Sequence, residues 1–178
     1  MRDARYVHQA SNSDYRNNAH YNRGHLFPVT HAFDTNDKKS TFTLTNIVPQ
    51  EISFNGSSWQ KMESCTKCVL QSYCINNKGV TEGFVVTGTW PSMSNTLNNR
   101  VNIPSMLCTA FCCYSHNTKD WLASAHWDDN IPEYESVYLQ TKTLAELHQE
   151  LSVNNSRFEA FPGTCTDRNM TRFGCTKQ

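Results

Sequence analysis

The run Asn22-Arg23-Gly24-His25 combines residue types that could hydrolyse a phosphate ester. A neutral histidine can take a proton from water because its pKa lies near working pH. On an extended chain Arg23 would point to the same side as His25 and offer its guanidinium to phosphate oxygens. His25 is therefore a candidate general base, and Arg23 is a candidate phosphate ligand. The alternatives are a hydrogen-bonded structural histidine and a surface salt bridge.

Two polar residues, Asn55 and Glu63, lie on the apolar face of a predicted helix. Residues 57–73 place apolar side chains on one face at helical spacing, with Ser57 or Ser58 as a possible cap. If the helix starts near Asn55, then Asn55, Trp59 and Glu63 follow one another at i, i+4. Polar groups among apolar neighbours are costly unless they have partners, which favours a binding site over a solvated face.

Asn55 is the candidate metal ligand on this stripe. Mg²⁺ keeps several of its waters, so one neutral amide oxygen can be enough as a protein ligand. A helix cap is the alternative. Asn55 also opens an Asn-Gly-Ser glycosylation sequon, and a glycan there would block the site. The metal role therefore predicts that Asn55 is unmodified.

Several motifs, in order, resemble those of the DNA/RNA non-specific endonucleases, the ββα-metal or His-Me finger family. They are NRGH at 22–25, TNIVPQ at 45–50, and FNGSSW at 54–59 followed by Met62-Glu63. The usual family pattern is D-R-G-H, then T-N-x-x-P-Q, then N-x-x-x-W-x-x-L-E. The resemblance extends over about residues 6–130. It is strongest to the endonuclease domain-containing 1 type of member, through the later VVTGTWP and RVNIPSMLC.

The resemblance implies a nuclease site with a divalent cation, Mg²⁺ or another ion such as Mn²⁺. It implies that His25 is the general base that activates water and that Asn55 carries the metal. Arg23 would hold the site or the phosphate. The substrates implied are DNA and RNA, cleaved with little sequence preference because the contacts are to phosphate and sugar.

Four further residues take roles from the same resemblance. Glu63 would hold metal-bound water, and Lys67, one helical turn further, would face phosphate. Asn46 and Gln50 would hold a strand end and scaffold the site. The alternatives are a salt bridge at Glu63, a surface lysine, and turn hydrogen bonds around Pro49 for the two amides.

The chain departs from the family pattern in two places. Asn22 stands where the family has Asp, so any role for that carboxylate in orienting its neighbours is lost. The NRGH motif also begins at residue 22, whereas family members carry an upstream stretch of strands and basic residues. We therefore expect residues 1–178 to be a single endonuclease domain, the C-terminal portion of the family domain, with its core motif at 20–75.

The overall charge and hydropathy exclude some classes of protein. The chain has 16 basic and 16 acidic residues, so bulk electrostatics would not hold nucleic acid, although an enzyme that touches a few phosphates remains compatible. The sequence contains no run of 18 apolar residues, the length that would be needed to span a membrane. No signal peptide is visible near Met1. The residues indicate no particular oligomeric state.

The chain has eight cysteines, an even and high count that favours a disulfide framework formed in an oxidising compartment. Free buried thiols are a second possibility. Zinc is a third, because Cys65-x-x-Cys68 has ligand spacing, but no second pair follows at a fitting distance. Together with the resemblance, the cysteines predict an extracellular, secreted protein.

The predicted fold class is α+β, a ββα-metal nuclease core with a mainly antiparallel sheet and peripheral helices. Asn, Ser and Thr are abundant and disfavour a helical bundle. Alternation and β-branched residues predict strands at 40–48, 83–90 (ending in a turn at Pro91), 105–114 and 121–127. The capping-box pattern Thr143-x-x-Glu146 predicts a short helix through Leu151.

Three functional hypotheses remain at this point. The first is the metal-dependent endonuclease just described. The second is a catalytically inactive, secreted, disulfide-rich binding module on the same scaffold, which the neutral charge and the missing upstream stretch favour. The third is a zinc-stabilised intracellular domain built on the cysteines.

Overall fold

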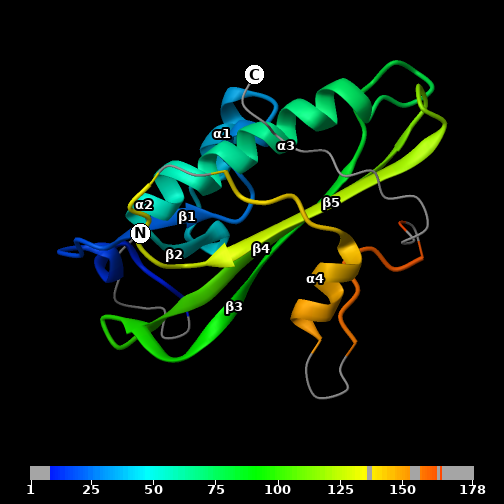
Figure 1. Cartoon of the computed structure of the whole chain (residues 1–178). Coiled ribbons are helices and arrows are strands. Elements are labelled where there is room, and N and C mark those ends of the chain that lie inside the picture. Colours follow the sequence, from blue (N-terminus) through cyan, green and yellow to red (C-terminus); the bar gives the residue numbers. More distant parts are fainter. Residues whose placement is uncertain (1–8, 136–137, 153–156, 164, 166–178) are drawn as a thin grey trace. The chain divides into compact units, whose positions relative to one another are not determined.

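The secondary structure is that of an α+β protein, as the sequence predicts (Figure 1). The computed structural model describes residues 9–135, 138–152, 157–163 and 165. Its strands form a two-stranded sheet of order β1-β2 and a three-stranded sheet of order β3-β4-β5. The strands are β1 (Tyr21–His25), β2 (Ile47–Glu51), β3 (Phe84–Leu97), β4 (Val101–Ser115) and β5 (Asp120–Asp129). The helices are α1 (Thr35–Ser40), α2 (Ile52–Phe54), α3 (Gln60–Tyr73) and α4 (Leu144–Leu151), with a π-helical turn η5 (Asn55–Trp59) and 3-10 turns η2 (Asn12–Tyr15), η3 (Val29–His31) and η4 (Leu44–Asn46).

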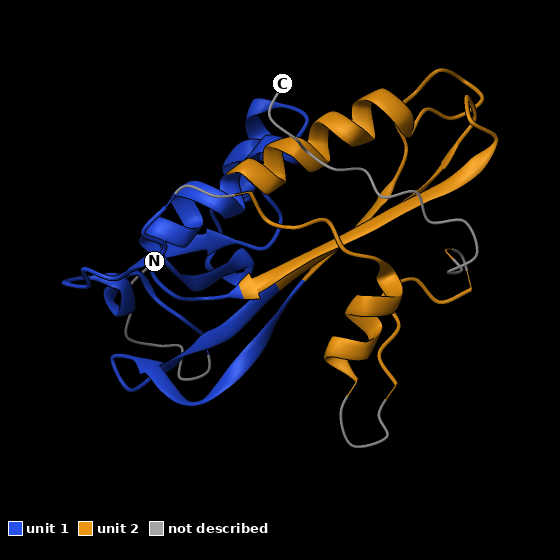
Figure 2. Cartoon of the chain, in the orientation of Figure 1, with its two compact units in different colours: residues 1–60, 88–107, 129–137 blue, residues 61–87, 108–128, 138–178 orange. Residues whose placement is uncertain are grey.

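The chain divides into two compact units (Figure 2). The first unit consists of residues 1–60, 88–107 and 129–137, and the second of residues 61–87, 108–128 and 138–178. The first therefore contains β1, β2 and α2, and the second contains α3 and α4. The expectation of one endonuclease domain over residues 1–178 stays a prediction.

In the first unit, β1 and β2 pair antiparallel, with Tyr21 opposite Glu51 and His25 opposite Ile47. One face of this pair contributes to a small apolar core. Because side chains alternate along a strand and paired residues share a face, Tyr21 and Ile47 lie on the same face as Arg23 and His25. Gly24 and Gln50 lie on the other face. The buried members of this core are Tyr15, Ile47, Leu97 and Ile103.

A tight turn joins β3 to β4. Its central residues, Asn98 and Asn99, have φ angles of 52° and 55°, and the N–H of Arg100 donates to the carbonyl of Leu97 at 3.1 Å. Two consecutive positive φ angles are typical of a type I′ hairpin turn, and asparagine tolerates them better than most residues. This turn aligns the two strands antiparallel.

The three strands predicted at 83–90, 105–114 and 121–127 are confirmed within β3, β4 and β5. The turn predicted at Pro91 is wrong, because β3 continues through it to Leu97. β3 is an edge strand of its sheet. Proline is tolerated at an edge because its missing N–H can face away from the ladder.

The strand predicted at 40–48 is wrong over most of its length. α1 ends at Ser40, η4 occupies Leu44–Asn46, and β2 begins only at Ile47. The Nδ2 of Asn46 donates to the carbonyl of Thr41 at 2.9 Å, which closes the backbone into a loop. Local bonds from an asparagine side chain thus replace the extended conformation that alternation predicts.

The helix predicted at 57–73 is confirmed, but the helical segment begins earlier, at Ile52. Ser57 and Ser58 lie inside it and do not cap it. The capping box before α4 is also confirmed, because the Oγ1 of Thr143 accepts from the N–H of Glu146 at 3.1 Å and Glu146 accepts from the N–H of Thr143 at 2.7 Å.

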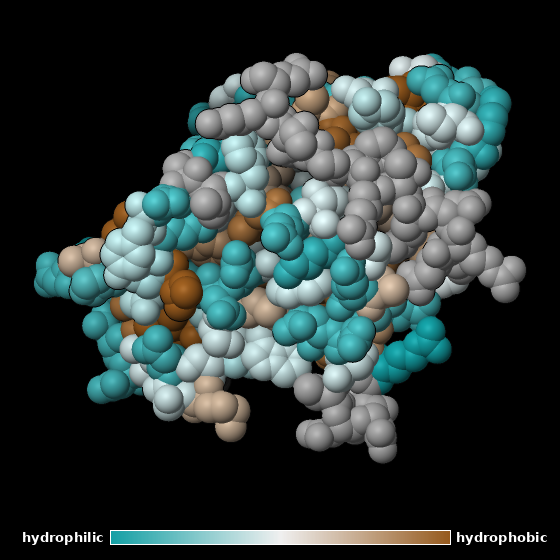
Figure 3. Space-filling view, viewed as in Figure 1, coloured by the Kyte–Doolittle hydropathy of each residue, from teal (hydrophilic) through white to brown (hydrophobic). Residues whose placement is uncertain are grey.

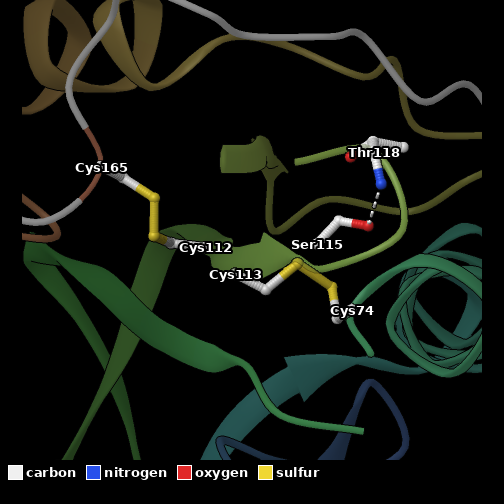
Figure 4. Close-up of a disulfide and its surroundings, with 6 residues drawn as sticks. All are labelled: Cys74, Cys112, Cys113, Ser115, Thr118 and Cys165. Atoms are coloured by element: carbon white, nitrogen blue, oxygen red, sulfur yellow. Dashed lines mark hydrogen bonds between the residues drawn. A yellow bond between two sulfur atoms is a disulfide. The ribbon is translucent and has the colours of Figure 1, made fainter. Parts of the chain in front are cut away.

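Two disulfides close the second unit, Cys74–Cys113 and Cys112–Cys165 (Figure 4). They join neighbouring residues of β4 to the end of α3 and to the C-terminal part of the chain. Cys65 is also disulfide-bonded, which removes it as a zinc ligand. The predicted disulfide framework is therefore confirmed for these residues. Cys68 is an exposed thiol and Cys108 a buried one.

The core of the second unit lies against these bridges. Its buried residues are Cys74, Phe111, Cys113 and Leu122, and Val69 and Leu70 of α3 pack on them. At the surface, hydrophobic residues lie scattered among hydrophilic ones on the face shown in Figure 3. Within the described part of the chain, no helix has the length and apolar character required to cross a bilayer.

Candidate active site

Strand β1 carries His25 and Arg23 toward the same side, as the sequence predicts. The strand is unbroken at Gly24, so residues two apart share a face. Arg23 is exposed, and its guanidinium carbon lies 4.9 Å from the centroid of the Tyr15 ring. Its Nη2 donates to the Oδ1 of Asn12 at 3.3 Å. These contacts hold the guanidinium in place while leaving it accessible to solvent.

The imidazole of His25 is half-buried and partly desolvated. Its ring meets that of Phe42 edge to face, with 4.8 Å between centroids. Its Nε2 is buried and has no hydrogen-bond partner among the described residues. Burial lowers the pKa of His25, because the charged form loses hydration there. The ring is therefore kept in the neutral form, the form that accepts a proton.

A second histidine with a lowered pKa has a different character. Burial lowers the pKa of His126 to about 4. Its Nδ1 lies 3.1 Å from the carbonyl oxygen of Gln140, which occupies a ring nitrogen in a backbone contact. His126 is therefore a structural histidine in the second unit, and it does not compete with His25 as a candidate base.

Gln50 lies directly on Gly24. A Cβ added at residue 24 would lie 2.6 Å from the Cβ of Gln50, which leaves no room for any side chain. Gln50 is fully buried, and neither atom of its amide has a hydrogen-bond partner among the described residues. The bare backbone of Gly24 therefore accommodates the side chain of Gln50.

Asn46 closes the connection that follows β1. Its Oδ1 accepts from the N–H of Phe27 at 2.9 Å, and its Nδ2 donates to the carbonyls of Phe27 at 3.0 Å and Thr41 at 2.9 Å. Its backbone carbonyl accepts from the N–H of Leu26 at 2.9 Å. These four bonds tie the chain on both sides of the loop to the end of β1, next to His25.

Glu51 sets the point at which the helical segment begins. Its carboxylate accepts from the N–H of Phe54 at 2.9 Å and from the hydroxyl of Ser53. A side chain that caps the first free N–H groups fixes where a helix starts. The cap therefore determines where Asn55, the next residue after Phe54, stands relative to the end of β2.

Asn130 fastens the end of β2 from a distant part of the chain. Its Oδ1 accepts from the N–H of Glu51 at 2.7 Å. Its Nδ2 donates to the carbonyls of Pro49 at 3.1 Å and Pro104 at 2.9 Å. The side chain is buried, so these three backbone groups form hydrogen bonds with one side-chain amide in place of water.

We expect Asn130→Ala to lower the free energy of unfolding by about 3 kcal/mol, because buried backbone groups would lose their partners. Urea denaturation of the two proteins measures the change. Asn77→Ala removes an exposed asparagine and should leave the midpoint nearly unchanged. Equal midpoints for Asn130→Ala and the parent protein would show that this amide does not hold β2.

Asn55 is half-buried and begins a π-helical turn that ends at Trp59. This corrects the expected regular i, i+4 series, since a π turn widens the spacing and shifts the following residues around the axis. Trp59 is buried and packs on Phe54, with ring centroids 5.5 Å apart. Single π-helical turns in α-helices are found frequently at functional sites.

Glu63 and Lys67 lie on α3, in the second unit. Both side chains are half-buried. The pairing of β1 and β2 thus brings together Arg23, His25, Asn46 and Gln50, with Asn55 following in the same unit. The roles expected of Glu63 and Lys67 stay predictions.

A family model described as DNA/RNA non-specific endonuclease matches residues 2–162. The chain belongs to this family. The resemblance seen in the sequence motifs is thereby confirmed. The match covers every candidate residue of the site, from Arg23 to Lys67.

The chain is similar in sequence to two human proteins. Endonuclease domain-containing 1 protein of Homo sapiens is 31% identical over 105 residues, which are 59% of this chain and 20% of the relative. Mitochondrial endonuclease G of Homo sapiens is 33% identical over 67 residues, 37% of this chain and 22% of the relative. The matched part of this chain therefore spans about a fifth of each relative.

The fold is similar to that of a chain in the crystal structure of the EndoG/EndoGI complex. The TM-score is 0.63 with 18% sequence identity, and the match covers 79% of this chain and 60% of that chain. This likeness confirms the predicted α+β class with a ββα-metal core. In this chain β1, β2 and the helical segment from Ile52 follow one another in the order β-β-α.

The amide donor at the candidate site suits a hard, well-hydrated cation. Within the described ranges, no three His, Cys, Asp or Glu side chains gather into a group that could hold a metal ion. Mg²⁺ keeps several waters and needs few protein oxygens, so the amide of Asn55 fits it by donor type.

Three residues that position the site carried no clear signal in the sequence. Glu51 is an uncommon cap, Asn130 acts across 79 residues, and Phe42 meets His25 from within a loop. Glu133 is a fourth, since its carboxylate accepts from the hydroxyl of Ser58 inside the helical segment. Only the family motif could have drawn attention to their neighbourhood.

Proposed function

We propose that this chain is a metal-dependent endonuclease that hydrolyses phosphodiester bonds of DNA and RNA with little sequence preference. The observation that carries the proposal is His25, a half-buried neutral histidine whose Nε2 is engaged by no described residue. It stands on a β-strand whose partner strand leads directly into the capped helical segment that bears Asn55. Membership in the DNA/RNA non-specific endonuclease family supports the same chemistry.

In this proposal His25 takes the proton of the attacking water through its unprotonated ring nitrogen. The lowered pKa of His25 keeps the ring neutral at neutral pH, so that one ring nitrogen can accept a proton. Arg23 is held over Tyr15 with its guanidinium in solvent, where it can bind phosphate oxygens. Its role is to orient the phosphate and to offset charge as the water adds.

Asn55 would hold Mg²⁺ or a similar divalent cation such as Mn²⁺. When bound, such a cation stabilises negative charge on the phosphate and on the leaving oxygen. Asn46 and Gln50 act as scaffold, because Asn46 ties the end of β1 to β2 and Gln50 fills the space over Gly24.

We propose an extracellular or secretory setting for the protein. The disulfides Cys74–Cys113 and Cys112–Cys165 support this, since such bonds persist in oxidising compartments.

The test is cleavage of plasmid DNA and of RNA by the purified, disulfide-bonded chain with Mg²⁺, beside the same reactions in EDTA. We expect cleavage of both polymers with Mg²⁺ and none in EDTA. Circular dichroism establishes that the protein is folded in both buffers. A folded protein that binds nucleic acid without cutting it would instead be the inactive binding module.

A further inference from the structure

The connection between β1 and β2 contains a pocket of about 420 Å³ in the first unit. Two phenylalanines and a histidine, Phe27, His31 and Phe33, line it, together with Asp37 and Ser40 of α1. Phe27 and His31 meet edge to face, with 6.3 Å between ring centroids. The pocket is therefore walled by aromatic rings and carries polar groups on its α1 side.

Its aromatic side chains are exposed to an extent that core packing does not explain. Phe27 is 51% exposed and Phe33 is 95% exposed, and neighbouring Phe42 is 62% exposed. Single exposed apolar residues are ordinary, but a cluster beside a pocket is typical of a binding surface. Because these side chains contribute little to core packing, their position beside the pocket favours a role in binding.

Hydrogen bonds and a ring contact connect the pocket to the candidate base. Asn46 bonds both the N–H and the carbonyl of Phe27, two residues after His25. Phe42 lies against the His25 ring itself. A nucleic acid strand with one phosphate at His25 would therefore place a neighbouring nucleotide at this pocket.

The charges around the pocket suit a nucleic acid strand. Lys38 and Lys39 are exposed in the last turn of α1 and can reach phosphates. The carboxylate of Asp34 is already used, because it accepts from the N–H groups of Asn36 and Asp37 to cap the helix. Asp37 and Ser40, which line the pocket, can bond the amino and ring N–H groups of a base.

We propose that this pocket binds one unpaired base of the substrate strand, stacked against Phe33 and Phe27. The proposal rests on the proposed nuclease function and adds a preference for single-stranded over duplex substrate. A base inside a duplex is stacked and paired on both sides, so it must be extruded before it can enter a pocket. An unpaired base stacks on an aromatic side chain without that cost.

The experiment compares Phe33→Ala with the parent protein on a fluorescent single-stranded oligonucleotide, its annealed duplex, and a single strand with a run of abasic residues. Anisotropy in EDTA measures binding without cleavage, and kcat/KM with Mg²⁺ measures turnover. We expect Phe33→Ala to weaken single-strand binding and kcat/KM by about tenfold, the loss of one base–aromatic stack. On the duplex and on the abasic strand, the same substitution should change binding and kcat/KM by less than about twofold. Met93→Ala, which removes another fully exposed apolar side chain, should change nothing.

Two results would overturn the pocket as a base site. One is equal loss on abasic and normal strands, and the other is single-strand binding that does not depend on Phe33. If the parent protein cuts nucleic acid while binding is independent of Phe33, only the pocket is rejected. If it cuts nothing but binds single strands through Phe33, the nuclease function is rejected and the pocket stands.

Discussion

Replacing His25 by alanine should reduce the rate of phosphodiester cleavage by about 10²–10⁴-fold, the range that a positioned general base contributes. The fold should survive, because the Nε2 of His25 bonds no described residue. Single-turnover cleavage of one oligonucleotide by the parent and variant proteins measures the loss. His20→Ala is the matched control, since His20 is an exposed histidine in the same unit. Equal rates in parent and His25→Ala proteins would remove His25 from the mechanism.

The pH profile tests the same residue by a different property. Burial lowers the pKa of His25, so the neutral base persists below the ordinary value of 6.5. Activity should therefore fall as the pH drops through a midpoint below 6.5, where His25 becomes protonated. Phe42→Ala should expose the ring edge and move that midpoint upward, toward 6.5. A profile that Phe42→Ala does not shift would assign the acidic limb to another group.

The parts of this site that were predictable from the sequence are those governed by local spacing. Alternation along a strand predicts that Arg23 and His25 lie on one side, and they do so in β1. The apolar spacing of 57–73 predicts a helix, and the capping box at Thr143 predicts where α4 begins. In each case residues a few positions apart determine the outcome.

The parts that were not predictable depend on contacts between distant residues or on a choice between competing local bonds. Asn130 holds Glu51 across 79 residues, and no periodicity marks such a pair. Asn46 could have continued a strand, but its amide bonds Phe27 and Thr41 and makes a turn instead. The π turn at Asn55 likewise breaks a regular spacing that the residue types alone would predict.

The position of Asn55 makes its replacement the sharpest test of the cation. Asn55→Ala should lower cleavage at a fixed Mg²⁺ concentration by about 10²–10³-fold, since a catalytic cation supplies several kcal/mol of charge stabilisation. Raising Mg²⁺ should restore part of the activity, because the cation can still bind through phosphate and water. Asn55→Asp keeps an oxygen ligand and should retain more activity than Asn55→Ala at the same concentration.

A control at Ser57 separates metal binding from glycosylation at the same asparagine. Ser57→Ala destroys the Asn55-Gly56-Ser57 sequon but leaves the amide of Asn55 in place. If the amide binds the cation, Ser57→Ala should cleave like the parent protein, and mass spectrometry of secreted protein should find Asn55 unmodified. A glycan mapped to Asn55, or equal Mg²⁺ dependence in the Asn55→Ala and parent proteins, would show that the cation is held elsewhere. Because Glu51 caps the helical segment four residues before Asn55, Glu51→Gln should raise the Mg²⁺ requirement in the same direction but by less.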